Sequence, residues 1–156
     1  MKRHLLLFMV AAVAALTVAA VALAQSGHFV GTPTCRDTGT QVECTGKVAG
    51  LGGTTFSLEV DAGEGIASVE CANPAGNVAP GQSFEFDATG TTGEIPTPRN
   101  GSARVTVASE APTAPAGSCP NPKWTATVTD VEFTGDATLT LREDGTVSDT
   151  ITVPIS

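Results

Sequence analysis

The stretch FSLEV, residues 56–60, alternates apolar and polar side chains with a period of two. Phe56, Leu58 and Val60 fall on one face, and the serine and glutamate between them fall on the other. Successive side chains of a strand point to opposite faces, so this pattern is typical of a strand that lies between a core and water. The stretch therefore predicts an antiparallel sheet rather than a helix.

The same alternation recurs along the chain, in segments rich in Thr and Val, which favour pleated sheet. The apolar rows are Ala67/Val69/Cys71, Phe84/Phe86/Ala88, Val105/Val107, Trp124/Ala126/Val128, Leu139/Leu141 and Ile151/Val153. At Asp130 the row that begins with Trp124 changes phase and continues one residue later at Val131, which predicts a β-bulge or a strand end. The fold class predicted is all-β, an antiparallel immunoglobulin-like β-sandwich of about eight strands, preceded by an N-terminal signal helix.

Turn residues separate these strands. DAGEG, residues 61–65, is expected to connect the strand containing Phe56 to the one containing Val69. Asn100-Gly101 and Asp144-Gly145 favour two-residue hairpin turns.

A proline-rich stretch, APTAPAGSCPNP at residues 111–122, is called the arm below. Its prolines lack N–H groups, so the arm cannot pair in a central strand, and its composition favours an extended polyproline-like connection. Because it is long for a loop in a compact domain, we expect it to be tied down or mobile.

The first 24 residues are typical of a secretory signal peptide, with a basic start, apolar residues 5–24 and a final Ala-Leu-Ala cleavage site. We therefore predict a signal peptide at 1–24 and a single secreted, extracellular β-sandwich domain at 25–156. The apolar stretch is also about long enough to span a bilayer, so an uncleaved anchor is the alternative.

The mature chain is acidic. Removing Lys2 and Arg3 from the 8 basic residues leaves six against 16 acidic ones, a net charge near −10. Such a field repels phosphate backbones and anionic membranes. We expect no nucleic-acid partner and, after signal cleavage, no membrane partner, and we expect a soluble monomer.

Four cysteines in a short secreted chain predict two disulfides. Cys35 and Cys44 flank a turn and are expected to pair, which leaves Cys71 with Cys119. The last two share a Cys-x-Asn-Pro frame, in which proline ends a strand and asparagine caps the turn. Their spacing does not match the close Cys pairs of zinc sites, and no Cys-x-x-Cys redox motif is present.

Catalytic motifs are absent from the sequence. His28 is the only histidine of the mature chain and is interpreted as a surface residue beside the first strand. There is no Gly-x-Ser-x-Gly, His-Glu-x-x-His or P-loop motif, and no carboxylate pair is marked as a glycosidase pair. We predict neither an enzyme nor a cofactor.

Two further possibilities stay open, calcium binding and glycosylation. Calcium is the ligand that the acidic groups would favour, although none follows a known calcium-binding pattern. These groups are Asp61/Glu64, Asp130/Glu132/Asp136 and Glu143/Asp144. Asn100 also begins a glycosylation sequon, which the Asn-Gly turn explains more simply.

Four segments together resemble a family of small secreted proteins of unassigned function from actinomycete-type bacteria. They are GTPTC at 31–35, CTGKVAGLG at 44–52, CANPAGNVAPGQ at 71–82 and CPNPKWTATVTDVEFT at 119–134. The resemblance implies secretion and a β-sandwich, and it brings no catalytic residues. A weaker likeness, carried by GSARVTV at 101–107 and the close pair Cys35/Cys44, is to the neocarzinostatin-type apoproteins, which carry a chromophore. In those proteins both disulfides are local, whereas Cys71 and Cys119 are far apart.

The expected function is therefore a non-enzymatic extracellular or cell-wall binding or structural module of unknown partner. The alternatives are a small-ligand carrier and an extracellular protease inhibitor. The arm supplies the candidate partner loop, with Lys123 beside it as a trypsin-like residue. The loop residues are Pro115, Pro120, Asn121 and Lys123.

Overall fold

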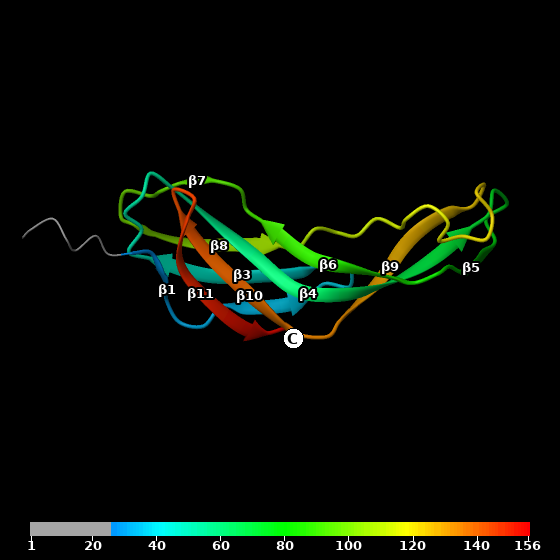
Figure 1. Cartoon of the computed structure of the whole chain (residues 1–156), viewed down its shortest axis with the longest axis horizontal. Helices are drawn as coiled ribbons and strands as arrows, with labels where there is room; N and C mark the ends of the chain where they lie inside the picture. Colours follow the sequence, from blue (N-terminus) through cyan, green and yellow to red (C-terminus); the bar gives the residue numbers. More distant parts are fainter. Residues whose placement is uncertain (1–25) are drawn as a thin grey trace, which may run out of the picture.

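The computed structural model describes residues 26–156, so the predicted signal peptide lies outside the described residues. These residues form eleven strands and no helix (Figure 1). The strands are β1 His28–Phe29, β2 Thr34–Asp37, β3 Val42–Ala49, β4 Thr55–Ala72, β5 Val78–Pro80, β6 Phe84–Thr91, β7 Ile95–Pro96, β8 Ser102–Ala108, β9 Thr125–Phe133, β10 Asp136–Glu143 and β11 Thr146–Pro154. In this part of the chain no helix is long and apolar enough to cross a membrane. The predicted all-β class is confirmed.

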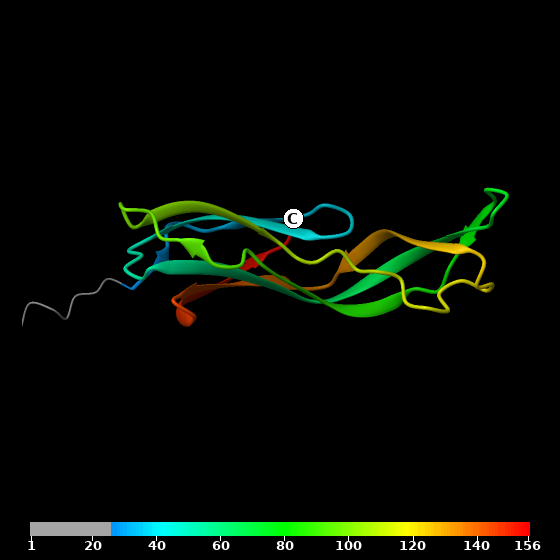
Figure 2. The ribbon, with the colours of Figure 1, turned by 90° about the horizontal axis from the view of Figure 1, so that it is seen from above.

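Two antiparallel sheets make the half of the molecule nearest residue 26. In the first sheet, β3 pairs with β1 and β2 along one edge and with β8 along the other. The second has the order β11-β10-β4, with β6 and β7 on the far edge of β4. Figure 2 shows these two layers face to face. The core between them is apolar and includes Phe56, Leu58, Leu139 and Leu141 from the second sheet and Val42 from the first.

The longest strand, β4, spans 18 residues and runs nearly the length of the molecule (Figure 1). Here the prediction of a turn at residues 61–65 is wrong, because the register shifts by a bulge between Asp61 and Glu64 and pairing then continues. Asp61 Oδ1 accepts a hydrogen bond from Gly63 N at 2.9 Å, and Ala62 is fully buried in the core. Aspartate and glycine favour bulges as well as turns, so the two structures share one sequence signature.

The partners of β4 are interrupted, which accounts for eleven strands where about eight were predicted. β5, β6 and β7 follow one another along one edge of β4, and β9 and β10 follow one another along the other. The predicted phase change in β9 is confirmed as a bulge between Val128 and Asp130, opposite Ser68 and Val69.

Of the two predicted hairpin turns, one is confirmed. Asp144 and Gly145, with φ of 45° and 79°, join β10 to β11 as both central residues of a primed turn. The prediction at Asn100-Gly101 is wrong, because β7 pairs in the second sheet and β8 in the first. That turn, closed by Gly101 N donating to Pro98 O at 2.8 Å, carries the chain between the layers.

Beyond the bulge of β4, the second sheet continues without the first sheet to cover it. Its inner face carries the buried side chains of Ala67, Val69, Cys71 and Val131. The arm runs along this distal part to the far pole (Figure 2). The distal half is thus a sheet covered by an extended segment rather than by a second sheet.

Candidate functional site

Two disulfides hold the fold, in the predicted pairing. Cys35–Cys44 joins neighbouring positions of β2 and β3 in the first sheet. Cys71–Cys119 joins β4 to the arm across 48 residues of sequence. No cysteine among the described residues is free.

The arm is tied to the rest of the protein at both ends. At its start, Glu110 N donates to Thr89 O of β6 at 2.8 Å. Near its end, Gln82 N donates to Ser118 O at 2.8 Å, beside the Cys71–Cys119 bond. The Ser118 hydroxyl donates to Pro115 O at 2.8 Å and is 4% exposed with its residue, so the arm turns inward there. These ties lie on the β4–β6 side of the distal half.

On the β9 side, the arm and the sheet are separated by a groove. It consists of two adjoining hollows of about 420 and 310 Å³, both of which touch Ala114 and Ala126. Trp124, a half-buried side chain, lines the larger hollow, and Thr40 of the β2–β3 turn closes the smaller one. We call this the arm groove.

The structure brings some of the predicted loop residues to this groove. Pro115 and Asn121 line it, whereas Pro120 and Lys123 are exposed and are not part of its lining. Asn121 caps the turn as the sequence predicts, since its Oδ1 accepts from Lys123 N at 2.9 Å and its backbone O accepts from Trp124 N at 3.0 Å.

Sequence reasoning assigned Trp124 to the core row of a strand and missed its place in the groove. The available signal was that the chain's single Trp directly follows a proline-rich segment in a sequence without Tyr. Trp at a half-exposed position beside proline is typical of a contact surface, because it offers a large apolar area with a polar N–H group.

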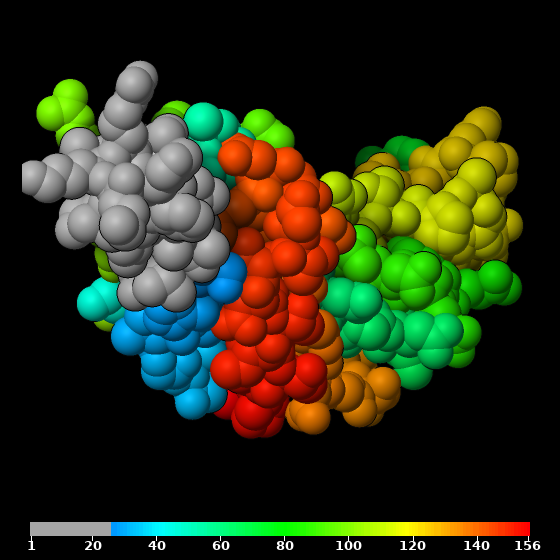
Figure 3. Space-filling model, turned by 60° about the vertical axis from the view of Figure 1, so that its left-hand side comes forward, coloured from blue at the N-terminus to red at the C-terminus, as the bar shows by residue number. Residues whose placement is uncertain are grey.

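At the opposite pole, carboxylates of the β10–β11 turn hold the N-terminal segment and the loop before β4. Glu143 accepts hydrogen bonds from Gly27 N at 2.6 Å, Gly52 N at 2.7 Å and Gly53 N at 3.1 Å, and from the Ser148 hydroxyl. Asp144 accepts from the backbone N of Thr54 and Thr55 and from the Thr54 hydroxyl. Figure 3 shows the N-terminal segment (blue) against this hairpin (orange and red). We call Glu143 and Asp144 the turn clasp.

Both carboxylates of the turn clasp are held in the charged form. Burial raises the pKa of Glu143, but the hydrogen bonds from Ser148 and the three backbone N–H groups outweigh it and leave this pKa below its ordinary value. The Thr54 hydroxyl, followed by the backbone N–H groups of Thr55 and Thr54, lowers the pKa of Asp144. All these donors belong to the fold, so the clasp is a structural feature.

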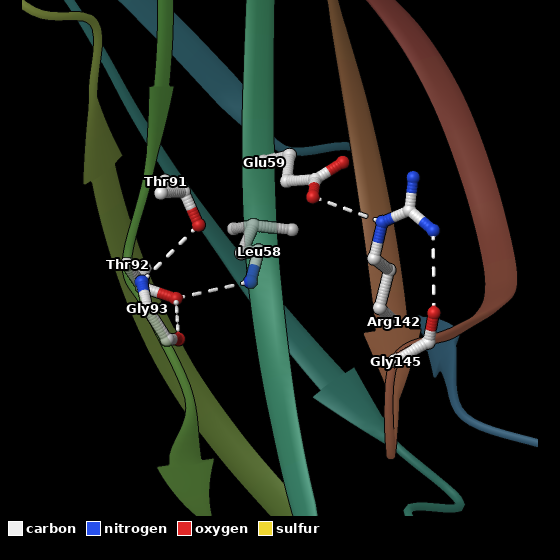
Figure 4. A network of polar contacts seen from close by, with 7 residues as sticks. All are labelled: Leu58, Glu59, Thr91, Thr92, Gly93, Arg142 and Gly145. Carbon is white, nitrogen blue, oxygen red and sulfur yellow. Dashed lines mark hydrogen bonds and ion pairs between the residues drawn. The ribbon is translucent and has the colours of Figure 1, made fainter.

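A shallow cleft of about 390 Å³ on the outer side of β4 contains the carboxylates Glu59, Asp61 and Glu110. Figure 4 shows that Glu59 faces Arg142 of β10, with Oε1 and Nε 2.9 Å apart. In the same view, the Thr92 hydroxyl accepts from Leu58 N at 3.0 Å and so fastens the chain after β6 to β4. These contacts tie neighbouring strands together.

The remaining candidates lie apart from one another. His28 is exposed in β1, with Nδ1 3.3 Å from Ser26 O. Asn100 is exposed, and its Oδ1 accepts from Ser102 N at 3.3 Å. Within residues 26–156, no three His, Cys, Asp or Glu side chains are placed to hold a metal ion.

Comparison with known proteins gives no relative. No protein-family model matches the chain, and searches of the curated proteins and of the solved structures find no significant match.

Proposed function

We propose that this protein is a secreted, non-enzymatic binding module of immunoglobulin-like architecture that recognises an extracellular protein or cell-wall component in the arm groove. The observation that carries the proposal is the arm itself. It is fastened by a disulfide and by backbone hydrogen bonds on one side, yet it leaves a groove lined by Trp124 on the other. A loop fixed in this way loses little conformational entropy when a partner binds.

Secretion is supported by the two disulfides, which persist in oxidising compartments. A non-enzymatic role is supported by the clasp, since the two carboxylates with lowered pKa values are engaged by backbone and hydroxyl donors of the fold. Lys123 supports protease inhibition as a second candidate, because it is exposed in a turn held by Asn121 next to a disulfide.

The test is affinity capture with the mature protein from the culture supernatant and cell-wall fraction of the source organism. We expect a partner that binds the natural protein and Val147→Ala, a variant at an exposed site far from the groove. Trp124→Ala should capture much less. Equal capture by Trp124→Ala, with its fold verified by disulfide mapping, contradicts the groove as the site. Loss of capture in Lys123→Ala, together with inhibition of a trypsin-like protease by the natural protein, supports the second candidate instead.

A further inference from the structure

One edge of β9 is open. β9 pairs with β4 along its inner edge, and no strand among residues 26–156 pairs with its outer edge. A single backbone bond reaches that edge, in which Val131 N donates to Gly39 O of the β2–β3 turn at 2.6 Å. An open strand edge presents N–H and C=O groups that another extended chain can pair with.

The bond at Val131 fixes which groups point outward. In an antiparallel ladder, the backbone groups of alternate residues point toward the partner strand or away from it. Val131 faces Ala67 and points away from β4. Val128 and Ala126 face positions two and four residues further along β4, so their N–H and C=O groups also point away. No described residue hydrogen-bonds to these outward groups.

Together with Thr127, these two residues form the β9 wall of the arm groove. The opposite wall is the arm, whose backbone from Ala111 to Ala114 makes no hydrogen bond to β9 or to any other described residue. The groove therefore lies between two extended backbones that both have unused polar groups. Its unused backbone groups are those that an added strand would bond to.

We propose that the arm groove binds an extended, cationic peptide segment, which adds to β9 as an outer strand. This inference rests on the proposed function and specifies its partner as a strand-forming stretch of polypeptide that has Lys or Arg at alternate positions.

The cationic character follows from the outer face of the sheet next to β9. Cross-strand partners share a face, so the residues paired with Ser68, Ile66 and Glu70 point outward with them. Those residues are Asp130, Glu132 and Thr127. The ion pairs among the described residues are Arg36–Glu43 and Arg142–Glu59, so these carboxylates lack a cationic partner within that part of the chain.

The remaining side chains of the added strand, on its other face, would point into the groove. There the lining includes Ala114, Ala126, Val128 and Trp124, which suit small apolar side chains, beside the threonines Thr40, Thr113 and Thr127. A peptide that alternates lysine with valine satisfies both faces at once. The edge from Thr125 to Asp130 is about 20 Å long at roughly 3.3 Å per residue, which is the length of about six residues, so a peptide of about seven residues covers it.

A second copy of this chain is a poorer occupant. Pairing of β9 with β9 would bring together two mature chains that each carry a net charge near −10. Like charges across such a pair are destabilising.

The test titrates the mature protein with an alternating Val/Lys peptide of about seven residues. Trp124 is the only Trp, and the chain has no Tyr, so fluorescence excited in the indole band reports the groove directly. We expect saturable binding that weakens as salt concentration rises, because exposed charge pairs are screened. Two control peptides are a Val/Glu peptide, which should not bind, and the Val/Lys peptide with alternate backbone nitrogens methylated, which should lose most of its affinity.

Protein variants test the same contacts from the other side. Val128→Pro removes an N–H group that points away from β4, and it keeps the hydrogen bonds between β9 and β4. This variant should weaken peptide binding by at least about tenfold. Val128→Thr keeps that N–H and should weaken binding by at most about threefold. Asp130→Asn and Glu132→Gln should each weaken binding about two- to fivefold. The control is Glu85→Gln on β6, which pairs with the opposite edge of β4.

Equal binding of the methylated and unmethylated peptides overturns strand addition, even where Trp124 still reports an occupied groove and the proposed function stands. Equal binding of the Val/Glu peptide overturns the cationic specificity. If the natural protein dimerises at the concentrations used and the Val128→Pro variant is monomeric, the open edge of β9 binds a second copy. That result also overturns the proposal. The proposed function fails separately if the capture experiment is insensitive to Trp124→Ala.

Discussion

At the scale of single residues, one carboxylate can organise several loops. Glu143 accepts hydrogen bonds from Gly27, Gly52 and Gly53, which belong to two segments that enter the sandwich at the same pole. Hydrogen bonds to a charged acceptor are about twice as strong as neutral ones. The turn clasp therefore replaces pairing that the short strand β1 cannot provide.

Glu143→Gln keeps the shape of the side chain and removes its charge. We expect a loss of about 1–2 kcal/mol in the free energy of unfolding, because charge-assisted hydrogen bonds become neutral ones and an NH2 group takes the place of one accepting oxygen and faces its donors. Urea unfolding of the mature protein measures this, with Glu85→Gln at an exposed site as the control. Equal midpoints for the two variants would contradict the clasp.

Acid should weaken the same contacts. The folded pKa values of Glu143 and Asp144 lie below their ordinary values, so their contribution to stability is present above the ordinary pKa of about 4. It is lost as pH falls through the lower, folded values. We expect the urea midpoint to fall with acidification in this range, and to fall less steeply in Glu143→Gln. An identical pH dependence in both proteins would refute the assignment.

At the scale of strands, the alternation of apolar and polar residues predicts well which side chains face the core. The turn residues predict poorly how the strands are connected. Phe56, Leu58, Leu139 and Leu141 are buried as their rows predict. The segment 61–65 was misjudged because a one-residue bulge and a turn use the same residues, and only pairing with β6 distinguishes them. Asn100-Gly101 was misjudged for a related reason, since a local turn signal does not say which sheet the next strand joins.

The sequence does not predict another feature at this scale, namely the close approach of β6 to the end of β8. A Cβ atom on Gly90 would lie 2.0 Å from Ala108 O, which is backbone and cannot rotate away. Gly90→Ala should therefore destabilise the protein by about 2–3 kcal/mol or more through overpacking. Gly135→Ala, where nothing lies within 4 Å, should change stability by less than about 0.5 kcal/mol. Thermal unfolding of both variants measures these changes in stability. An unchanged stability in Gly90→Ala would contradict the close contact.

At the scale of the whole molecule, the protein has two poles held in different ways. A two-sheet core and the turn clasp hold the pole near residue 26, while one sheet, the arm and Cys71–Cys119 form the other (Figure 1). The arm groove lies in the half where a second sheet is missing, so the architecture leaves one strand edge unpaired.

The two disulfides should therefore respond differently to removal. In the chain-entropy model, replacing Cys71 and Cys119 by Ser removes about 4 kcal/mol of stability, and replacing Cys35 and Cys44 removes about 2.5 kcal/mol. The first change should also shift the emission of Trp124 to longer wavelength, because the arm is no longer fastened. Unfolding curves and native-state emission spectra test both statements. An unchanged Trp124 spectrum in the Cys71/Cys119 variant would contradict the role of this bond in fixing the arm.

The sequence predicts several parts of the site, but it does not predict the groove between the arm and β9. The cysteine pairing, the capping by Asn121 and the extended course of the arm follow from sequence patterns. The groove depends on which side the arm is tied and on the open edge of β9, and both are long-range facts. No periodicity in residues 111–133 distinguishes an edge strand from a central one.

The most direct test of the central claim is an NMR titration of isotopically labelled mature protein with the Val/Lys peptide. We predict that the largest shift changes fall on the amides of Ala126 and Val128, on Thr113 and Ala114 of the arm and on the indole N–H of Trp124. Changes confined to the pole of Gly27 and Glu143, or none at saturating peptide, would contradict the claim that the protein binds its partner as an added strand in the arm groove.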